Sequence, residues 1–237
     1  MTYRNPTIAG ESRILNSYSL GNVSVDRRGF DSNGYGFPDR RATYAGGLVG
    51  WMRNCQDTWI QYCFASTVEV FAETVPPAVY AGGILAFMGI SNDSTGHLYN
   101  NAALGASVTA MGKTAAALNA NRIYSGFDGR NNLYQITSNW MFESDQNYAR
   151  DTMRVEKGSD TTTFFPFWDG TGAEPASYYH YPNGSESDKH GENASGSIFQ
   201  NQHIWTGLLE FNSNGSDAWD FSTISRGYPR LRNVGGQ

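Results

Sequence analysis

The chain has 237 residues, a formal net charge of −5 and a sequence isoelectric point near 5.3. This length is sufficient to bury a real core, in one large domain or two smaller ones. An acidic chain without a concentrated basic face is not expected to bind nucleic acid, and no run of about 18 apolar residues is present to span a membrane.

The composition favours an all-β chain. Its 27 glycines and its 14% of aromatic residues are typical of strands separated by many turns. Residues 102–118 have some helical propensity because they are rich in alanine, but Gly105 and Gly112 argue against a long helix.

Three segments of similar sequence recur along the chain: residues 42–50 (ATYAGGLVG), 78–86 (AVYAGGILA) and 118–126 (LNANRIYSG). Their equivalent residues Leu48, Ile84 and Ile123 are 36 and 39 residues apart, a period typical of stacked repeats. If the repeats stack as coils, equivalent residues are about 4.8 Å apart, so we expect Tyr44 beside Tyr80 and Leu48 beside Ile84.

The paired glycines before each apolar run predict a corner. We expect Gly46-Gly47 and Gly82-Gly83 to turn the chain through positive φ before a buried strand begins.

A second set of similar segments accompanies the first: residues 14–25 (ILNSYSLGNVSV), 59–70 (WIQYCFASTVEV) and 99–109 (YNNAALGASVT). Asn16 aligns with Asn100, and both are expected at corners, where stacked amides satisfy backbone groups. One deletion in the middle copy aligns Val68 and Val70 with Val23 and Val25. A weaker fourth copy is expected at residues 133–141, after which the pattern stops.

The sequence predicts two parts, a repeat region at residues 1–147 and a non-repeating region at 148–237. Stacked repeats expose an apolar end unless another segment covers it. The second part has the aromatic residues to do so: Trp168, Trp205, Phe211, Trp219 and Phe221.

Residues 176–197 contain the turn sequence Pro-Asn-Gly and are expected to form an exposed loop. We identify Tyr178, Tyr179 and Tyr181 in this loop as candidate ligand contacts, because flat aromatic faces stack on sugars and anchor protein partners. Trp51, which follows the first glycine motif, is a further candidate. The alternative is that two of the tyrosines fold back onto the repeat.

No catalytic residue is assigned. Cleavage of a polysaccharide needs two carboxylates, or a carboxylate with a basic residue, at one groove. Glu210, Asp217 and Asp220 with Arg226 are the candidates, but their spacing matches no known signature. If they were catalytic, they would line one groove and show perturbed titration.

Neither a metal nor another cofactor is expected. His180, His190 and Asp188 have suitable ligand atoms, but their Gly- and Ser-rich surroundings predict a poorly preorganised loop. Cys55 and Cys63 have seven residues between them, which matches no zinc motif and leaves a disulfide open.

The segments NSYSLGNVSV, YAGGLVGW, AGGILA, NRIYSG and the closing YPRL resemble the GLUG-motif repeats of bacterial cell-surface and secreted proteins. The resemblance covers about residues 10–142. It implies a right-handed parallel β-helix-like solenoid, here with a C-terminal aromatic-rich cap, and an extracellular, non-catalytic scaffold such as those of adhesins. The chain departs from the pattern where Arg122 replaces the second glycine of the third copy.

The sequence therefore predicts an adhesion or recognition module, secreted or on the outer surface of a bacterium, with a glycan or protein ligand. The residues after Met1 lack a signal peptide and read like the interior of a longer protein, so a fragment is expected. The alternatives are a polysaccharide-cleaving enzyme on a β-helix scaffold and a structural spacer within a larger surface protein.

Overall fold

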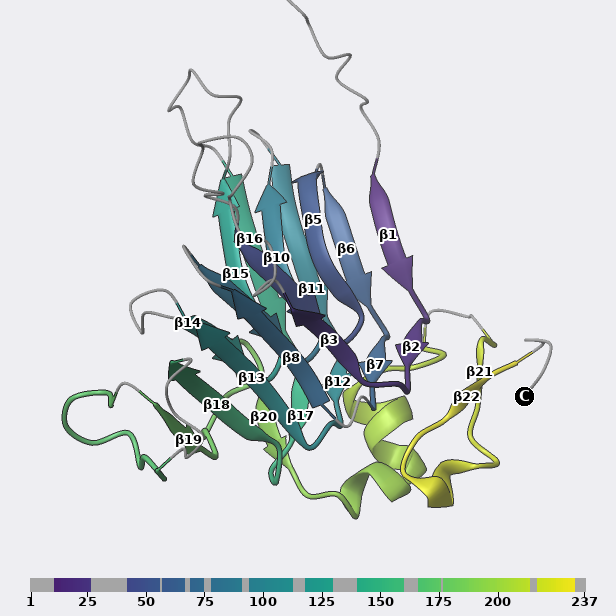
Figure 1. Cartoon of the computed structure of the whole chain (residues 1–237). Coiled ribbons are helices and arrows are strands. Elements are labelled where there is room, and N and C mark those ends of the chain that lie inside the picture. The colour runs from purple at the N-terminus through teal and green to yellow at the C-terminus, as the bar shows by residue number, and fades with distance from the viewer. Residues whose placement is uncertain are drawn as a thin grey trace, which may run out of the picture.

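A computed structural model describes residues 11–26, 42–55, 57–66, 69–74, 78–90, 94–112, 118–129, 140–159, 166–175, 177–213 and 217–232. In these residues the protein is all-β, with short helical turns near the C-terminus (Figure 1). None of the described helical segments is long and apolar enough to cross a membrane.

The chain passes through the same order of strands several times, and we call each passage a row. The first row contains β1 (Ser12–Leu15), β2 (Tyr18–Ser19), β3 (Val23–Asp26), β4 (Thr43–Gly46) and β5 (Val49–Cys55). The second contains β6 (Thr58–Gln61), β7 (Phe64–Ala65), β8 (Glu69–Thr74), β9 (Val79–Gly82) and β10 (Leu85–Ile90). The third contains β11 (Ser94–Tyr99), β12 (Ala102–Ala103), β13 (Ser107–Gly112), β14 (Leu118–Asn121) and β15 (Tyr124–Gly129). The fourth contains β16 (Trp140–Asp145), β17 (Tyr148–Arg150) and β18 (Arg154–Ser159).

Each strand pairs in parallel with the strand at the same place in the next row. The resulting sheets have the strand orders β1-β6-β11-β16, β2-β7-β12-β17-β20, β3-β8-β13-β18-β19, β4-β9-β14 and β5-β10-β15. β20 (Glu192–Ala194) extends its sheet in parallel, whereas β19 (Tyr178–His180) pairs antiparallel with β18. Near the C-terminus, β21 (Trp219–Asp220) and β22 (Arg230–Leu231) form a small antiparallel pair.

The predicted period is confirmed at the glycine motifs. Tyr44 pairs with Tyr80, and their rings stack with centroids 5.3 Å apart. The backbone N–H of Leu48 donates to the carbonyl of Ile84 at 3.1 Å, and that of Ile84 donates to the carbonyl of Ile123 at 2.9 Å. Equivalent residues therefore lie one strand spacing apart.

One detail of the predicted alignment is wrong. Val70 pairs with Val23 and Val25 with Ala72, because the second row has one residue more than the first between β7 and β8. The fourth copy begins at Trp140, and the residues at 130–139, which include most of the predicted copy, lie outside the described residues.

Parallel pairing continues past the expected division of the chain. Strands β17 and β18 pair with β12 and β13 through Ser159, and β20 then pairs with β17. The expected boundary after residue 147 therefore falls between β16 and β17, inside the fourth row.

The paired glycines serve close approach and not positive φ. Among the described residues, positive φ occurs at other glycines, such as Gly191 and Gly227. A Cβ atom on Gly46 would lie 1.9 Å from the carbonyl oxygen of Val49, and one on Gly83 would lie 1.9 Å from that of Arg122. These corners are tight because the backbone itself occupies the space of a side chain.

The corner between the first and second strands of each row has a left-handed backbone. Asn16, Tyr62, Asn100 and Gln146 occupy equivalent places in the four rows and have φ between 48° and 57°. Asn16 and Asn100 thus lie at corners, as predicted. Asparagine tolerates this conformation better than most residues.

Buried amides connect the rows one residue after this corner. Asn101 Nδ2 donates to the carbonyl of Ile60 at 3.0 Å, and Asn101 Oδ1 accepts the N–H of Cys63 at 3.2 Å. Asn147 repeats both bonds one row further on, to Leu98 and Asn101. Both asparagines are fully buried, so their amides satisfy backbone groups that water cannot reach.

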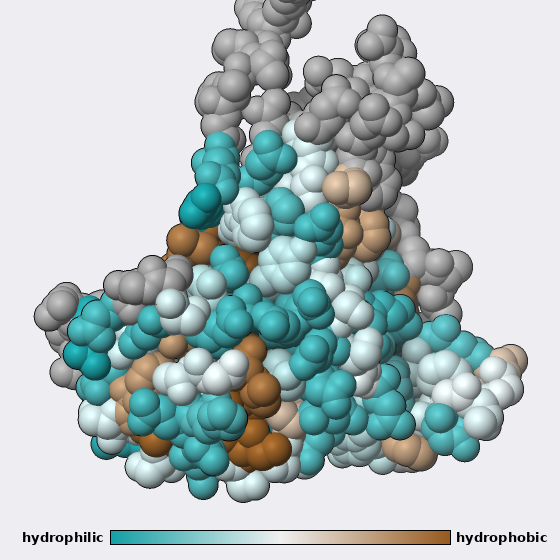
Figure 2. Space-filling model, turned by 180° about the vertical axis from the view of Figure 1, so that it is seen from behind, coloured by the Kyte–Doolittle hydropathy of each residue, from teal (hydrophilic) through white to brown (hydrophobic). Residues whose placement is uncertain are grey.

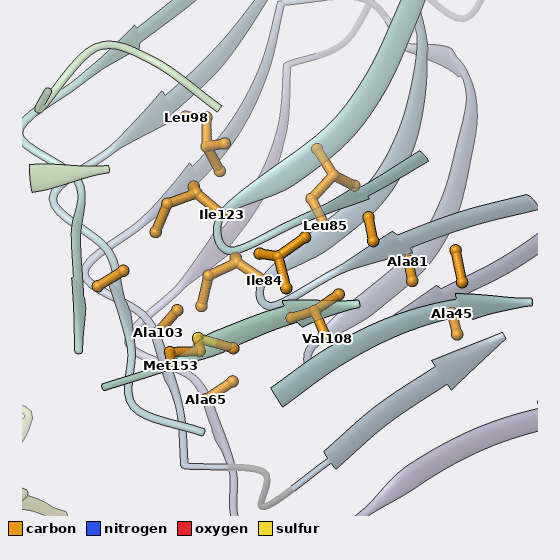
Figure 3. Packing of buried hydrophobic residues seen from close by; sticks show 14 of the residues in the cluster. Ala45, Ala65, Ala81, Ile84, Leu85, Leu98, Ala103, Val108, Ile123 and Met153 are labelled. Atoms are coloured by element: carbon orange, nitrogen blue, oxygen red, sulfur yellow. The ribbon is translucent and has the colours of Figure 1, made fainter. Parts of the chain in front are cut away.

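The main core lies between the sheets (Figure 3). Ile84, Leu85 and Ile123 fill it, and the alanines Ala45 and Ala81 pair in register where β4 and β9 approach it. Cys63 also lies in this core as a free thiol. The disulfide between Cys55 and Cys63, which the sequence left open, is therefore not formed. Burial raises the pKa of Cys63 to about 12.

A second apolar cluster covers the outer face of the β2-β7-β12-β17-β20 sheet. Along β7, Ala65 faces the main core and Phe64 faces this cluster, where it contacts Trp205 and Trp219 with ring centroids 5.4 and 5.5 Å apart. Trp219 also donates from Nε1 to Asn16 Oδ1 at 2.9 Å. The C-terminal aromatic residues therefore pack on the flank of the rows. Figure 1 shows the C-terminal segment on this flank, whereas the sequence predicted that it covers the end of the repeats.

Residues before β20 cover the end of the rows instead. The carbonyl of Lys189 accepts the N–H groups of Ile123 and Tyr124, and the carbonyl of Glu186 accepts that of Asn147. Lys189 thus takes the place that Ile84 and Ile123 have in the preceding rows.

Replacement of Asn101 by alanine should destabilise the protein strongly, because it leaves the buried N–H of Cys63 and the carbonyl of Ile60 without a partner. We expect the free energy of unfolding to fall by about 2 to 4 kcal/mol. Urea unfolding at equilibrium measures it. The exposed Asn22→Ala is the control, and equal losses in both variants would contradict a structural role for the buried amide.

Candidate functional site

Residues 177–197 were predicted to lie in an exposed loop, but they include two strands that pair with the rows. These strands are β19 and β20, and β19 pairs residue by residue with β18, so that Tyr179 lies opposite Glu156. Tyr178 is only 1% exposed. Its ring packs against Trp168 at 4.7 Å, and its hydroxyl donates to Glu174. The structure therefore places Tyr178 inside, where it is not available to a ligand.

The other two predicted tyrosines lie at an exposed edge with a third aromatic residue. Phe167 is 58% exposed and Tyr181 48% exposed, and Tyr179 lies between them with ring centroids 5.6 and 6.3 Å away. We call these three residues the aromatic edge. Phe167 directly precedes Trp168, one of the aromatic residues expected to cover the repeats, but the bridge between Phe167 and Tyr179 joins residues that no local pattern connects.

A cation adjoins the aromatic edge. The guanidinium carbon of Arg154 lies 5.3 Å from the centre of the Tyr179 ring, a cation–π distance, and the same side chain forms an ion pair with Glu156. The interplanar angles of 65° and 84° between successive rings turn their faces in different directions. The edge can thus contact a ligand with ring faces, ring edges and a positive charge.

Trp51 belongs to another surface. It is 44% exposed on β5, and its ring stacks on Tyr44 with centroids 5.1 Å apart. Tyr44 in turn stacks on Tyr80, so Trp51 extends a column of rings that follows the register of the rows.

The β1-β6-β11-β16 sheet carries a line of interacting side chains across three rows that the sequence did not reveal. Trp59, His97 and Glu143 occupy equivalent positions in three rows. The rings of Trp59 and His97 stack at 3.7 Å, and Glu143 Oε2 contacts His97 Nδ1 at 3.1 Å and accepts the Tyr99 hydroxyl at 2.6 Å. Burial and Glu143 raise the pKa of Tyr99 above its ordinary value, so this phenol stays protonated and does not act as a base.

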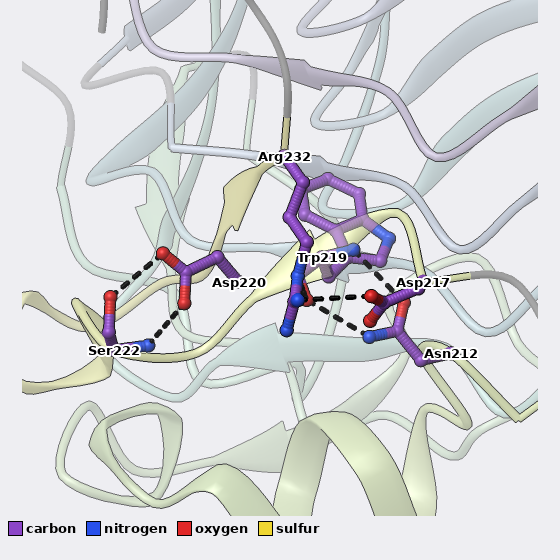
Figure 4. A network of polar contacts seen from close by, with 6 residues as sticks. All are labelled: Asn212, Asp217, Trp219, Asp220, Ser222 and Arg232. Carbon is purple, nitrogen blue, oxygen red and sulfur yellow. Dashed lines mark hydrogen bonds and ion pairs between the residues drawn. The ribbon is translucent and has the colours of Figure 1, made fainter.

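Two of the three carboxylates considered for catalysis, Asp217 and Asp220, are bound locally. Asp217 pairs with Arg232 at 3.0 Å, whereas Asp220 accepts hydrogen bonds from the backbone and hydroxyl of Ser222 (Figure 4). These bonds lower the pKa of Asp220, the opposite of what a general acid requires. Figure 4 shows the two carboxylates directed to different partners and not toward one site.

The two histidines considered as metal ligands are partly buried next to Arg122. The rings of His180 and His190 are 6.1 Å apart, and their Nδ1 atoms have no hydrogen-bond partner among the described residues. Across those residues, no group of three His, Cys, Asp or Glu side chains is placed to hold a metal ion.

Arg122, which interrupts the glycine motif, is fully buried at the covered end of the rows. Its guanidinium donates to the carbonyls of His190 and Gly191 and, at 2.6 Å, to Asn193 Oδ1. Burial lowers the pKa of Arg122 to about 10, so the group is still charged at neutral pH. This charge and the burial keep the nearby histidines neutral.

The surface has no single dominant apolar area on the face seen in Figure 2. Hydrophobic residues there form small patches that hydrophilic residues separate. Among the described residues, the large apolar side chains that are most exposed include Phe167 and Met141.

Comparisons with known protein families and with curated proteins find no match. Among solved structures, the chain is similar to one described as "a putative immunoglobulin A1 protease from Bacteroides ovatus", with 17% sequence identity and a TM-score of 0.43. The match covers 93% of this chain and 57% of that chain. A likeness of this strength does not assign an activity.

The neutral histidines predict that stability falls in acid. Burial, with Arg122 nearby, lowers the pKa of His190 to about 3, and burial, with Lys157 nearby, lowers that of His180 to about 4. Between these values and the ordinary value of 6.5, the unfolded chain binds more protons than the folded one. The free energy of unfolding therefore decreases as the pH falls through this range.

We expect His190→Gln to reduce the loss of stability between pH 7 and pH 5 by about 1 to 2 kcal/mol. Urea unfolding at both pH values measures this, with the exposed His203→Gln as the control. The same pH dependence in His190→Gln and in the wild type would contradict a buried neutral imidazole.

Proposed function

We propose that the chain is a non-catalytic recognition module of a bacterial surface protein and that it binds a glycan at the aromatic edge. The observation that supports this proposal is that Phe167 and Tyr181 are each about half exposed beside Tyr179, at the outermost strand of a five-stranded sheet. Aromatic rings held in this way stack on the apolar faces of sugars and lose little entropy on binding.

The rigidity of the edge favours recognition. Strand β19 is fixed to β18 by its backbone, and Tyr178 anchors it from the inside through Trp168 and Glu174. Tyr178 thus supports the site without contacting the ligand. The neighbouring Arg154 adds donors for sugar hydroxyls.

We further propose that the rows form a right-handed β-helix-like solenoid of the GLUG-motif type, located outside the cell. The repeated strand order and the parallel pairing between rows support this architecture. In this proposal the solenoid extends to Ser159, residues 178–194 cover its end, and the C-terminal aromatic residues cover its flank as a lateral cap.

Polysaccharide cleavage on the same scaffold and a purely structural spacer are the alternatives. The local bonding of Asp217 and Asp220 gives the first alternative no support at those residues. The second predicts that the aromatic edge has no ligand.

A glycan-array screen of the wild type and of the Phe167→Ala/Tyr181→Ala double variant tests the proposal. We expect selective binding to at least one glycan and a loss of at least about tenfold in affinity in the variant, since buried aromatic contacts dominate such interfaces. The control is Ile198→Ala/Leu208→Ala, which removes two similarly exposed apolar side chains elsewhere.

Incubation of each bound glycan with the wild type, followed by product analysis, distinguishes binding alone from cleavage. Cleavage would contradict the non-catalytic proposal. Binding that survives in the double variant would contradict the aromatic edge as the site, and no binding at high protein concentration would favour the spacer.

A further inference from the structure

A hollow with a volume of about 90 Å³ lies on the flank of the rows, between the corners after the short strands and the C-terminal segment. Arg150 and Ser66 contribute to its wall from the rows, and Gln200 and Arg226 contribute from the C-terminal segment. Phe199 and Tyr228 add aromatic surface. This volume is below the roughly 300–1,000 Å³ of typical small-molecule pockets, so the hollow suits one small group of a larger ligand.

The two arginines reach the hollow from distant parts of the sequence. Arg150 is the last residue of β17, and Arg226 is the last residue of the short helical turn η4 (Ile224–Arg226). A Cβ atom on Gly196 would lie 3.0 Å from Nη2 and 3.1 Å from Nε of Arg150, so the glycine leaves room for this guanidinium. Gly227, with φ of 96°, ends η4 and turns the chain toward Tyr228.

Neither guanidinium group has a counter-charge among the described residues. Arg13, Arg154 and Arg232 each pair with a carboxylate. By contrast, in the described part of the chain neither the Arg150 nor the Arg226 side chain has an ion pair or a hydrogen bond. The described lining of the hollow includes no Asp or Glu. Both arginines are exposed, so water solvates them when the hollow is empty, and an anion that binds there can accept hydrogen bonds from charged donors.

The other lining groups indicate what carries the anion. The Ser66 hydroxyl and the Gln200 amide can both donate and accept hydrogen bonds, which suits sugar hydroxyls better than a bare inorganic anion. Tyr228 is partly exposed, and its ring rests on Phe64 with centroids 5.7 Å apart, so an aromatic surface is fixed in place beside the charges. Such a surface can pack against a pyranose ring.

We propose that this hollow is a second site, distinct from the aromatic edge, that binds the carboxylate or sulfate group of an acidic saccharide. Arg150 and Arg226 hold the anionic group, Ser66 and Gln200 bind neighbouring hydroxyls, and Tyr228 contacts the ring. The proposal goes beyond glycan binding at the aromatic edge and does not depend on it.

Titration of the whole chain with glucuronic acid, glucose 6-sulfate and glucose, followed by calorimetry or by NMR chemical shifts, tests the proposal. We expect one of the two acidic sugars to bind at least about tenfold more tightly than glucose, and more weakly as the salt concentration rises. Which of the two binds distinguishes carboxylate from sulfate. Arg150→Gln and Arg226→Gln should each reduce this binding at least about tenfold.

Arg13→Gln removes one positive charge from another surface and should leave the binding unchanged. The Phe167→Ala/Tyr181→Ala variant should also retain it, so failure of the aromatic edge and failure of the hollow are distinguishable. Thermal unfolding confirms that each variant is folded.

Equal affinity for acidic and neutral sugars, or no binding of acidic sugars at millimolar concentration, would overturn the proposal. Free acetate or sulfate that binds as tightly as the sugars, or a peptide carboxylate that binds more tightly, would overturn the saccharide as the ligand.

Discussion

The amide ladder at the left-handed corner holds successive rows in register. A chain that turns from β11 into β12 takes its backbone groups out of sheet pairing, and the interior offers no water to satisfy them. Asn101 and Asn147 replace the lost partners and bond to the row before. Once this corner is fixed, the sheets on both sides of it stack in the same register, and the side chains on the outer faces align in columns.

The columns explain where candidate functional groups lie. Trp59, His97 and Glu143 come from three rows and meet because each row returns to the same place. The aromatic edge arises in a different way, because β19 breaks the parallel pattern and ends its sheet. A surface on the columns is repetitive, whereas the edge and the arginine hollow are built by segments that occur once. Selective recognition is more readily achieved by such unique segments.

The sequence predicted what depends on local repetition. The period of Leu48, Ile84 and Ile123 identified the register, because similar corners impose similar paths on the chain in all three rows. It failed where one residue changed the path, as with the extra residue before Val70. The sequence also did not show that Tyr178 is buried. Its burial depends on β19 folding back antiparallel onto β18 and on the contact with Trp168. The contact of Glu143 with His97 depends instead on the parallel register of β16 with β11, which the predicted fourth copy at residues 133–141 did not give.

Arg122 shows how a departure from the motif gives the end of the rows its structure. At the equivalent place in the row before, a side chain on Gly83 would collide with the carbonyl of Arg122, because the next row lies directly against it. On the other side of Arg122, the segment at 189–193 takes the place of a further row. The long Arg122 side chain fits there and donates hydrogen bonds to the backbone of this segment. This bonding fixes the segment between β19 and β20. The residue that ends the repeat thereby also helps to hold the covering segment that follows the aromatic edge.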